Sequence, residues 1–112
     1  MAITSADYAS LYMATEVPYN KGDAEPFLDL FADEFAFMGN MIARADFGDV
    51  VRNNVANGMQ FRTVGLNAYG PFLIDYGILL MPDGGESLLV GVLRFNEQGK
   101  VIEYIQGSPA PA

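Results

Sequence analysis

Hydrophobic residues follow a helical repeat in the first half of the chain. The repeating positions are Tyr8, Leu11, Tyr12, Thr15 and Tyr19. They predict a first helix that ends where Pro18 interferes. Two shorter repeats predict a second helix after Asp23 and a third after Asp46, with each aspartate as an N-cap. Between these helices, 34–38 alternates weakly and is expected to form a short strand followed by a loop.

The second half of the chain changes to a strand pattern. Runs rich in β-branched and aromatic residues cover 60–69, 72–81, 87–96 and 100–106, and turn residues separate them. They predict successive hairpins. The two central runs are apolar on both faces, so we expect the helices to cover one face and a partner subunit the other.

The composition narrows the classes of function. The 112 residues suffice for one domain with a core, and the formal charge of −8 disfavours nucleic acid as a partner. Histidine and cysteine are absent, and phosphate-binding and dinucleotide motifs are missing, so we expect no metal site and no cofactor. Any proton transfer then has to use a carboxylate, a tyrosine or water. Without a long apolar run or a secretory signal, a cytoplasmic protein that does not enter a membrane is expected.

Two motifs resemble those of a known superfamily. The segments Asn20-Lys21-Gly22-Asp23 and Phe31-Ala32-Asp33-Glu34 resemble the N-x-G-D and F-A-D-D signature of SnoaL-like and ketosteroid-isomerase-like proteins. The segment from Arg94 to Ile102 resembles their R-F-x-x-x-G-K-I/V hairpin. The order of the predicted elements is also that of the nuclear-transport-factor-2-like (NTF2-like) fold.

The resemblance implies an α+β fold in which a curved, cone-shaped antiparallel sheet wraps around three N-terminal helices. One domain is expected over 1–107. The tail over 108–112 has nothing to bury and is expected to be flexible. In active relatives, polar groups line an apolar cavity between the helices and the concave face of the sheet.

Three catalytic positions of the ketosteroid isomerases are changed in this chain. An ungapped alignment places their general-base aspartate on Gly39, their oxyanion-hole tyrosine on Thr15 and their protonated aspartate on Gly91. In those enzymes a phenol and a neutral carboxylic acid stabilise an enolate. Steroid-type isomerisation by that mechanism is therefore not expected here.

The same alignment and the alternation of side chains assign the faces of the sheet. Tyr76 is expected to point inward, with Asp75 outward and opposite Arg94 as a structural ion pair. The inward positions of the central hairpin are Phe72, Ile74, Tyr76, Ile78 and Leu80, with Leu89, Gly91, Leu93 and Phe95. The apolar outer positions are Leu73, Leu79, Met81, Leu88, Val90 and Val92.

Three residues are candidates for catalysis. Tyr76 and Tyr104 are expected to polarise an oxygen of a bound molecule, and Asp46 or water to move the proton. The candidate ligand-binding residues are Tyr12, Thr15, Tyr19, Asn40, Arg44, Ile78, Gly91, Leu93 and Gln106. A phenol with its ordinary pKa near ~10 is a poor base at neutral pH, so the scheme needs a perturbing neighbour. The alternative is structural, with the tyrosines as core aromatics and Asp46 as a helix cap.

Two functions fit these observations. In the first, the tyrosine-lined cone binds a small uncharged cyclic or aromatic molecule, with or without isomerase-, cyclase- or lyase-type proton transfer. In the second, the cone is filled and the protein is a non-catalytic association module. It would form a homodimer or dock another protein through the outer sheet face. An open cavity favours the first function, and a cone packed with side chains favours the second.

Overall fold

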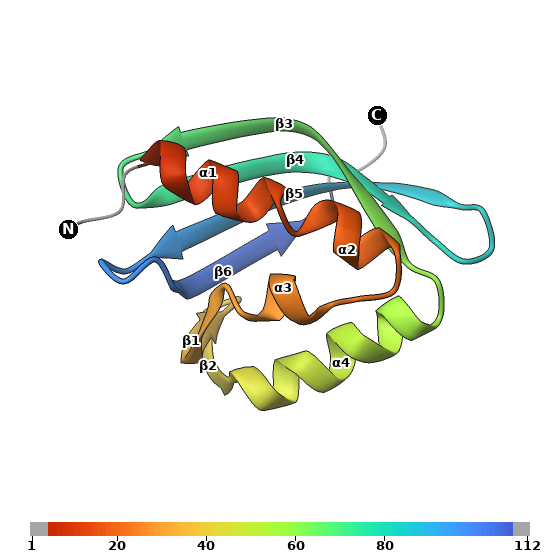
Figure 1. Cartoon of the computed structure of the whole chain (residues 1–112), viewed down its shortest axis with the longest axis horizontal. Coiled ribbons are helices and arrows are strands. Elements are labelled where there is room, and N and C mark those ends of the chain that lie inside the picture. The colour runs from red at the N-terminus through yellow and green to blue at the C-terminus, as the bar shows by residue number, and fades with distance from the viewer. Residues whose placement is uncertain (1–4, 109–112) are drawn as a thin grey trace.

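The computed structural model describes residues 5–108, in which helices and strands follow one another in a mixed order (Figure 1). The elements are α1 Ser5–Met13, α2 Glu16–Asn20, α3 Glu25–Leu28, β1 Phe31–Phe37, β2 Asn40–Ala43, α4 Arg44–Ala56, β3 Gln60–Tyr69, β4 Phe72–Leu80, β5 Glu86–Phe95 and β6 Val101–Gly107. Apart from Ser108, the tail expected at 108–112 lies outside the described residues, as do the first four residues of the expected domain.

The six strands form one curved sheet with the order β2-β1-β6-β5-β4-β3. All neighbouring strands are antiparallel except β1 and β6, which pair in parallel. The helices lie on the concave side, with α1 and α2 running along β3 and β4 and with α4 forming the opposite wall (Figure 1). The expected α+β cone is confirmed, although its sheet is mixed rather than wholly antiparallel.

The first predicted helix is broken into two. Thr15 ends α1, because its backbone N–H and its hydroxyl both donate to the carbonyl of Tyr12, at 3.0 and 2.7 Å. A new helix, α2, starts at Glu16, so Pro18 falls in a first turn, where its missing N–H breaks no hydrogen bond. The proline therefore explains why one continuous helix does not form.

Two other elements differ from the prediction. The second helix is only the four residues of α3, because Phe31 leaves it to begin β1 opposite Val101 of β6. The segment expected as a loop contains the short strand β2. The third helix starts at Arg44 with Ala43 as its N-cap, so the expected Asp46 cap is wrong. Asp46 lies instead in the first turn, where the helix dipole favours a carboxylate.

The alternation of inward and outward side chains along β4 is opposite to the prediction. Leu73 is fully buried and Asp75 is 4% exposed, whereas Tyr76 is 40% exposed on the outer face. The cause is the turn before β5. Gly84 donates its N–H to the carbonyl of Met81 at 2.9 Å, so Pro82 and Asp83 occupy the centre of the turn and Leu80 pairs with Glu86. Because this differs by three residues from the expected register, every side chain of β4 changes face relative to β5.

The new register corrects several expected contacts. Asp75 lies opposite Gly91, not Arg94, and Phe72 lies opposite Arg94. Arg94 instead forms an ion pair with Glu103 of β6, at 2.9 Å between Nε and Oε1. Phe72 and Ile74 are exposed on the outer face, so their expected inward positions are wrong, as is the expected outward position of Leu73.

The narrow end of the cone is packed. The ring of Tyr8 stacks on Phe95 with centroids 4.3 Å apart. The fully buried side chains are Phe31, Phe35, Leu73, Leu93 and Val101. Burial of these groups stabilises the domain by roughly 1.5–3 kcal/mol for each large apolar side chain. No helix within residues 5–108 has the length and apolar character that crossing a bilayer requires.

Asn20 joins the end of α2 to the edge strand β3. Its side-chain amide donates to the carbonyl of Phe61 at 2.8 Å and its Oδ1 accepts from the N–H of Phe61 at 2.9 Å. These two bonds satisfy the backbone of Phe61, whose ring is then directed into the core, where it is 8% exposed. The amide thus fixes one rim of the wide end of the cone.

Candidate functional site

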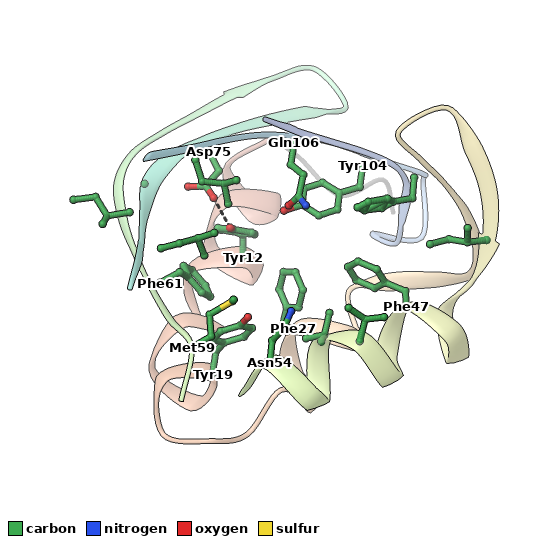
Figure 2. Close-up of a pocket in the computed structure, with 18 of the residues that line it drawn as sticks. Tyr12, Tyr19, Phe27, Phe47, Asn54, Met59, Phe61, Asp75, Tyr104 and Gln106 are labelled. Atoms are coloured by element: carbon green, nitrogen blue, oxygen red, sulfur yellow. Dashed lines mark hydrogen bonds between the residues drawn. The ribbon is translucent and has the colours of Figure 1, made fainter. Parts of the chain in front are cut away.

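A cavity of about 500 Å³ opens at the wide end of the cone. Its lining residues are Tyr12, Tyr19, Phe27, Phe37, Ile42, Asp46, Phe47, Val50, Val51, Asn54, Met59, Phe61, Asp75, Gly77, Ile78, Leu79, Leu89, Tyr104 and Gln106. Figure 2 shows Asp75, Gln106 and Tyr104 on the sheet side and Phe27, Phe47 and Asn54 on the helical side. The wall is mostly apolar and aromatic, as expected for a small-molecule site.

Asp75 and Tyr12 form a buried polar pair in this apolar surrounding. The Tyr12 hydroxyl donates to Oδ2 of Asp75 at 2.5 Å, a distance typical of a strong bond between a hydroxyl and a carboxylate. Tyr12 comes from α1 and Asp75 from β4, so the pair bridges the helical and sheet walls (Figure 2). Tyr12 is 3% exposed.

The second oxygen of Asp75 has no hydrogen-bond partner among the described residues. Burial raises the pKa of this carboxyl, while the bond from Tyr12 lowers it and the nearby Glu16 carboxylate raises it further. A carboxyl in a cavity that has an oxygen without a partner and a raised pKa is a candidate proton-transfer group. The sequence could not supply such a group because Asp75 was expected on the other face.

Tyr104 is the second buried phenol in the cavity. Its ring lies against Gly91, where an added Cβ would come within 3.2 Å of Cε1 of Tyr104 and 3.6 Å of its hydroxyl oxygen. Gly91 is the residue opposite Asp75 on β5, so the Tyr104 hydroxyl and the Asp75 carboxyl lie on the same part of the sheet. Burial raises the pKa of Tyr104, and the negative charge of Asp75 adds to this effect. Tyr104 therefore remains protonated, and its hydroxyl is able to donate a hydrogen bond.

The structure brings six of the predicted site residues to the cavity. They are Asp46, Tyr104, Tyr12, Tyr19 and Gln106, together with Ile78, which borders the cavity although it lies opposite Leu88 in the outward phase of β4. Burial also raises the pKa of the Tyr19 phenol. Asp46 lies toward the open side, on α4, and is exposed.

Six others do not line the cavity. Tyr76 is on the outer face of the sheet because of the β4 phase. Thr15 is 2% exposed, and its hydroxyl donates to the carbonyl of Tyr12. Asn40 is exposed in β2. Gly91 and Leu93 face inward as expected, but Tyr104 covers Gly91 and Leu93 is sealed in the core.

Arg44 lies outside the cavity, in a separate polar depression beside α3 and β2. It forms an ion pair with Asp33 at 3.0 Å and donates to the carbonyl of Phe31 at 3.0 Å. These contacts fix the start of α4. Among residues 5–108, no cluster of three or more metal-binding side chains occurs.

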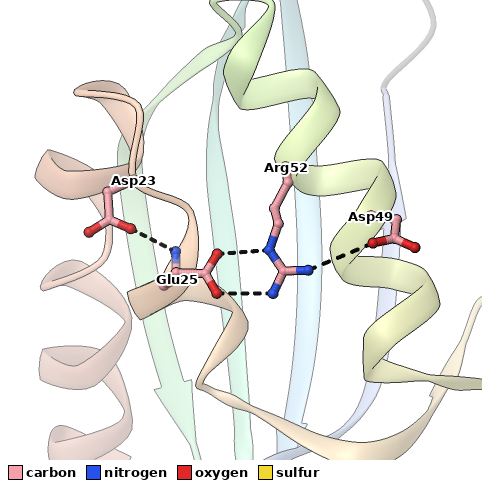
Figure 3. A network of polar contacts seen from close by, with 4 residues as sticks. All are labelled: Asp23, Glu25, Asp49 and Arg52. Carbon is pink, nitrogen blue, oxygen red and sulfur yellow. Dashed lines mark hydrogen bonds and ion pairs between the residues drawn. The ribbon is translucent and has the colours of Figure 1, made fainter.

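A network of charges holds the α4 wall against α3 (Figure 3). Arg52 donates to both carboxylate oxygens of Glu25, at 2.8 and 2.9 Å, and lies 3.8 Å from Asp49. Asp23 accepts the N–H of Glu25 at 3.1 Å. The bonds from Arg52 lower the pKa of Glu25. This network positions the helix that carries Asp46 and Asn54.

The site residues predicted from the sequence omit six polar or aromatic members of the cavity wall, namely Asp75, Asn54, Phe27, Phe37, Phe47 and Phe61. Asp75 was missed because both faces of β4 are apolar, although Pro82 and Gly84 mark the turn that sets its register. Asn54 lies on the cavity side of α4, one turn before the C-terminal stop at Asn57. Phe61 could have been found, because it is the first apolar residue of an alternating edge strand.

Comparison by sequence finds no matching family model and no matching curated protein. Comparison by structure finds many similar folds. A SnoaL-like protein from Burkholderia thailandensis is 14% identical, with a TM-score of 0.77 over 98% of this chain and 100% of the other. An NTF2-like protein from Mesorhizobium loti is 16% identical, with a TM-score of 0.79 over 95% and 93%.

A third similar structure is an enzyme. It is SalBIII, an epoxide hydrolase/cyclase-like enzyme with a role in pyran ring formation in the polyether salinomycin. It is 14% identical, with a TM-score of 0.78 over 93% of this chain and 92% of the other. At such identities the likeness establishes the fold. The chain therefore has the cone-shaped NTF2-like fold of the SnoaL-like structures, as the sequence motifs predicted.

Proposed function

We propose that the cavity binds a small cyclic or aromatic molecule and that Asp75 transfers a proton on it, in an isomerase-, cyclase- or lyase-type reaction. The observation that carries the proposal is the buried Asp75 carboxyl, which has one oxygen held by Tyr12 and the other without a hydrogen-bond partner within residues 5–108. The open cavity also favours ligand binding over a filled cone.

The positions of the two groups support this chemistry. Asp75 lies directly across from Gly91, where the alignment with ketosteroid isomerases placed their protonated aspartate. Tyr12 lies one helical turn before Thr15, where it placed their tyrosine. A phenol and a carboxyl thus recur in the cavity at neighbouring positions. Asp75 replaces Tyr76 in our scheme, and Tyr104 keeps its expected role of polarising an oxygen.

The roles of the residues follow from their protonation. Asp75 in its ionised form accepts a proton through its free oxygen, and in its neutral form it returns one. The raised pKa of Asp75 is closer to neutral pH than the ordinary pKa of an aspartate. A group transfers protons most efficiently when its pKa lies near the working pH. Tyr104 stays protonated and donates to an oxygen of the bound molecule. The expected role of Asp46 as the proton carrier stays a prediction; its side chain is exposed and lines the cavity.

Proton exchange in D₂O tests the proposal. Small cyclic ketones and lactones are first screened for a rise in melting temperature, and those that bind are followed by proton NMR for exchange at the carbon next to the carbonyl. We expect faster exchange with the wild type than in buffer, and no acceleration with Asp75→Asn. The matched control is Tyr76→Phe, on the outer face, which should behave as the wild type. Bound compounds that exchange no faster than in buffer would contradict the catalytic role.

We also propose that the protein forms a homodimer through the outer sheet face. The observation behind it is a group of exposed apolar side chains on β4, β5 and β6, at 38–44% exposure, consisting of Phe72, Ile74, Tyr76, Leu88 and Ile105. Ile74 lies opposite Val92 and Tyr76 opposite Val90, so the group is continuous across the strands.

Light scattering during size-exclusion chromatography tests the dimer. The wild type should elute with twice the mass of one chain, and Ile74→Lys should elute as a monomer that still binds the ligands of the cavity. A monomeric wild type at high concentration would refute the dimer and leave the ligand proposal standing. The cytoplasmic location expected from the sequence stays a prediction.

A further inference from the structure

The cavity has ionisable groups of only one sign. Its lining includes the carboxylates of Asp46 and Asp75 and no lysine or arginine. The six basic residues of the chain lie elsewhere and are Lys21, Arg44, Arg52, Arg62, Arg94 and Lys100. Three of them are held by carboxylates outside the cavity, in the pairs Arg44–Asp33, Arg52–Glu25 and Arg94–Glu103. Together with the formal charge of −8 on the whole chain, this distribution of charges favours a cation over an anion as a ligand.

Aromatic rings add to this potential. The ring of Phe47 lies 5.5 Å from Phe37 and 6.3 Å from Tyr104, and 6.4 Å from Phe27, measured between centroids. All four rings line the cavity. The face of an aromatic ring attracts cations, and the attraction is strongest where water is excluded.

Asp75 supplies the anchoring group. It is 4% exposed and lines the cavity, and its Oδ1 has no hydrogen-bond partner among residues 5–108. A buried carboxylate is stable only when its charge is paired and its oxygens are bonded. Tyr12 satisfies Oδ2, so Oδ1 is the oxygen that can accept a hydrogen bond from a ligand.

We propose that the molecule bound in the cavity carries a positively charged nitrogen, and that an N–H of this nitrogen donates to Oδ1 of Asp75 while the aromatic rings surround the rest of the molecule. The ligand class is a protonated cyclic or aromatic amine. This differs from the uncharged ligand predicted from the sequence, because that prediction placed Asp75 outside. The inference rests on the proposed use of the cavity as a binding site.

An amine that donates to Oδ1 occupies the one oxygen of Asp75 that the proposed reaction uses, because Tyr12 holds Oδ2. For such a ligand the cavity is a binding site, and the inference does not depend on proton transfer by Asp75.

Three benzyl compounds of similar size test the inference. They are N,N-dimethylbenzylamine, which is protonated at pH 7, its neutral carbon analogue isobutylbenzene, and the anion phenylacetate. Dissociation constants are measured from shifts of the backbone amide signals of the ¹⁵N-labelled protein. We expect the amine to bind at least about tenfold more tightly than isobutylbenzene, equivalent to about 1.4 kcal/mol, and phenylacetate not to bind.

Two variants assign the preference to Asp75. Asp75→Asn should reduce the preference for the amine to less than about twofold while isobutylbenzene binds as before. Glu97→Gln changes the net charge equally at an exposed turn outside the cavity and should keep the preference. If Asp75→Asn does not fold, NOE contacts between the N-methyl protons and the Tyr12 ring in the wild type decide the orientation.

The outcomes separate the two proposals. If isobutylbenzene binds in the cavity as tightly as the amine, the inference is overturned and the binding site stands. If the amine is preferred equally by Asp75→Asn, or if its methyl groups lie away from Tyr12, Asp75 is not the anchor and the inference is also overturned. If neither compound shifts the signals of cavity residues at millimolar concentration, the inference and the proposed binding site both fail.

Discussion

Replacing Tyr12 by phenylalanine tests the buried polar pair directly. The variant keeps the ring, which is 3% exposed and lies 6.1 Å from the ring of Phe61, and removes only the hydroxyl. Asp75 is then left with two oxygens that have no partner, because Oδ2 loses its 2.5 Å bond and Oδ1 has none.

The magnitude follows from the charge of the acceptor. A hydrogen bond to a charged group contributes about 1.5–3 kcal/mol, so we expect a loss of about 2 kcal/mol in the free energy of unfolding at pH 7. With about 2.1 cal/mol/K of unfolding entropy per residue, a chain of 112 residues should then melt about 8 °C lower.

The loss should depend on pH. Burial raises the pKa of Asp75 and the Tyr12 bond lowers it, so removing the bond raises this pKa further. The difference between wild type and variant is therefore largest where the wild-type carboxyl is ionised. It should fall to about 1 kcal/mol at acidic pH, where the carboxyl is neutral in both proteins.

Urea unfolding at neutral and acidic pH measures both effects. Tyr76→Phe removes a hydroxyl from the neighbouring residue of Asp75, on the outer face, and should change stability by less than about 0.5 kcal/mol. A double-mutant cycle with Asp75→Asn should show that the two effects are coupled. Equal losses in Tyr12→Phe and Tyr76→Phe, or a loss that does not vary with pH, would refute the buried pair.

Three other changes test different parts of the structure. Gly91→Ala puts a Cβ 3.2 Å from the Tyr104 ring and should lower stability by about 1 kcal/mol in urea unfolding, whereas Gly107→Ala, with open space around it, should not; equal effects would contradict the contact. The raised pKa of Asp75 means that the folded wild type binds more protons than the unfolded chain, so its stability should fall as pH rises through that pKa, and Asp75→Asn should remove this part of the slope. Arg52→Met should lower the melting temperature slightly at neutral pH, because it removes the ion pair with Glu25. The difference from the wild type should vanish at high salt, and also as pH falls through the lowered pKa of Glu25. A difference that persists at low pH would contradict the ion pair.

The sequence predicted the strands better than the helices. The four strands of the second half are present within one residue of their predicted limits, because each is bounded by turn residues and rich in β-branched and aromatic side chains. The helices of the first half were harder. Pro18 indicates from the sequence that a helix ends nearby. That a second helix begins at Glu16 depends on the hydrogen bonds of Thr15, which the sequence does not reveal. Phe31 has helical spacing, yet its pairing with Val101, distant in sequence, makes it a strand residue.

The candidate site was predicted in part. Tyr104 and Gln106 were placed in the cavity by the alignment with the ketosteroid isomerases together with the alternation of side chains, and both line it. Asp75 was misplaced because β4 is apolar on both faces. The pattern of apolar and polar residues then does not show which side chains of the strand point inward. The inward and outward positions of β4 depend on the turn between β4 and β5. Two four-residue turns are possible there, Met81-Pro82-Asp83-Gly84 and Asp83-Gly84-Gly85-Glu86. Proline favours the second position of a turn, so the first of these has the better chemistry and sets the register observed.

The position of β6 in the sheet has a consequence for synthesis of the chain. Among the strands of residues 5–108 it is synthesised last, yet it lies between β1 and β5. Until it emerges, no strand joins the β1–β2 hairpin to the β3–β5 meander by hydrogen bonds, and Tyr104 and Gln106 are still missing from the cavity. A nascent chain stalled before Val101 should therefore be sensitive to protease. Resistance to protease should appear in one step once β6, up to Gly107, has emerged from the ribosome.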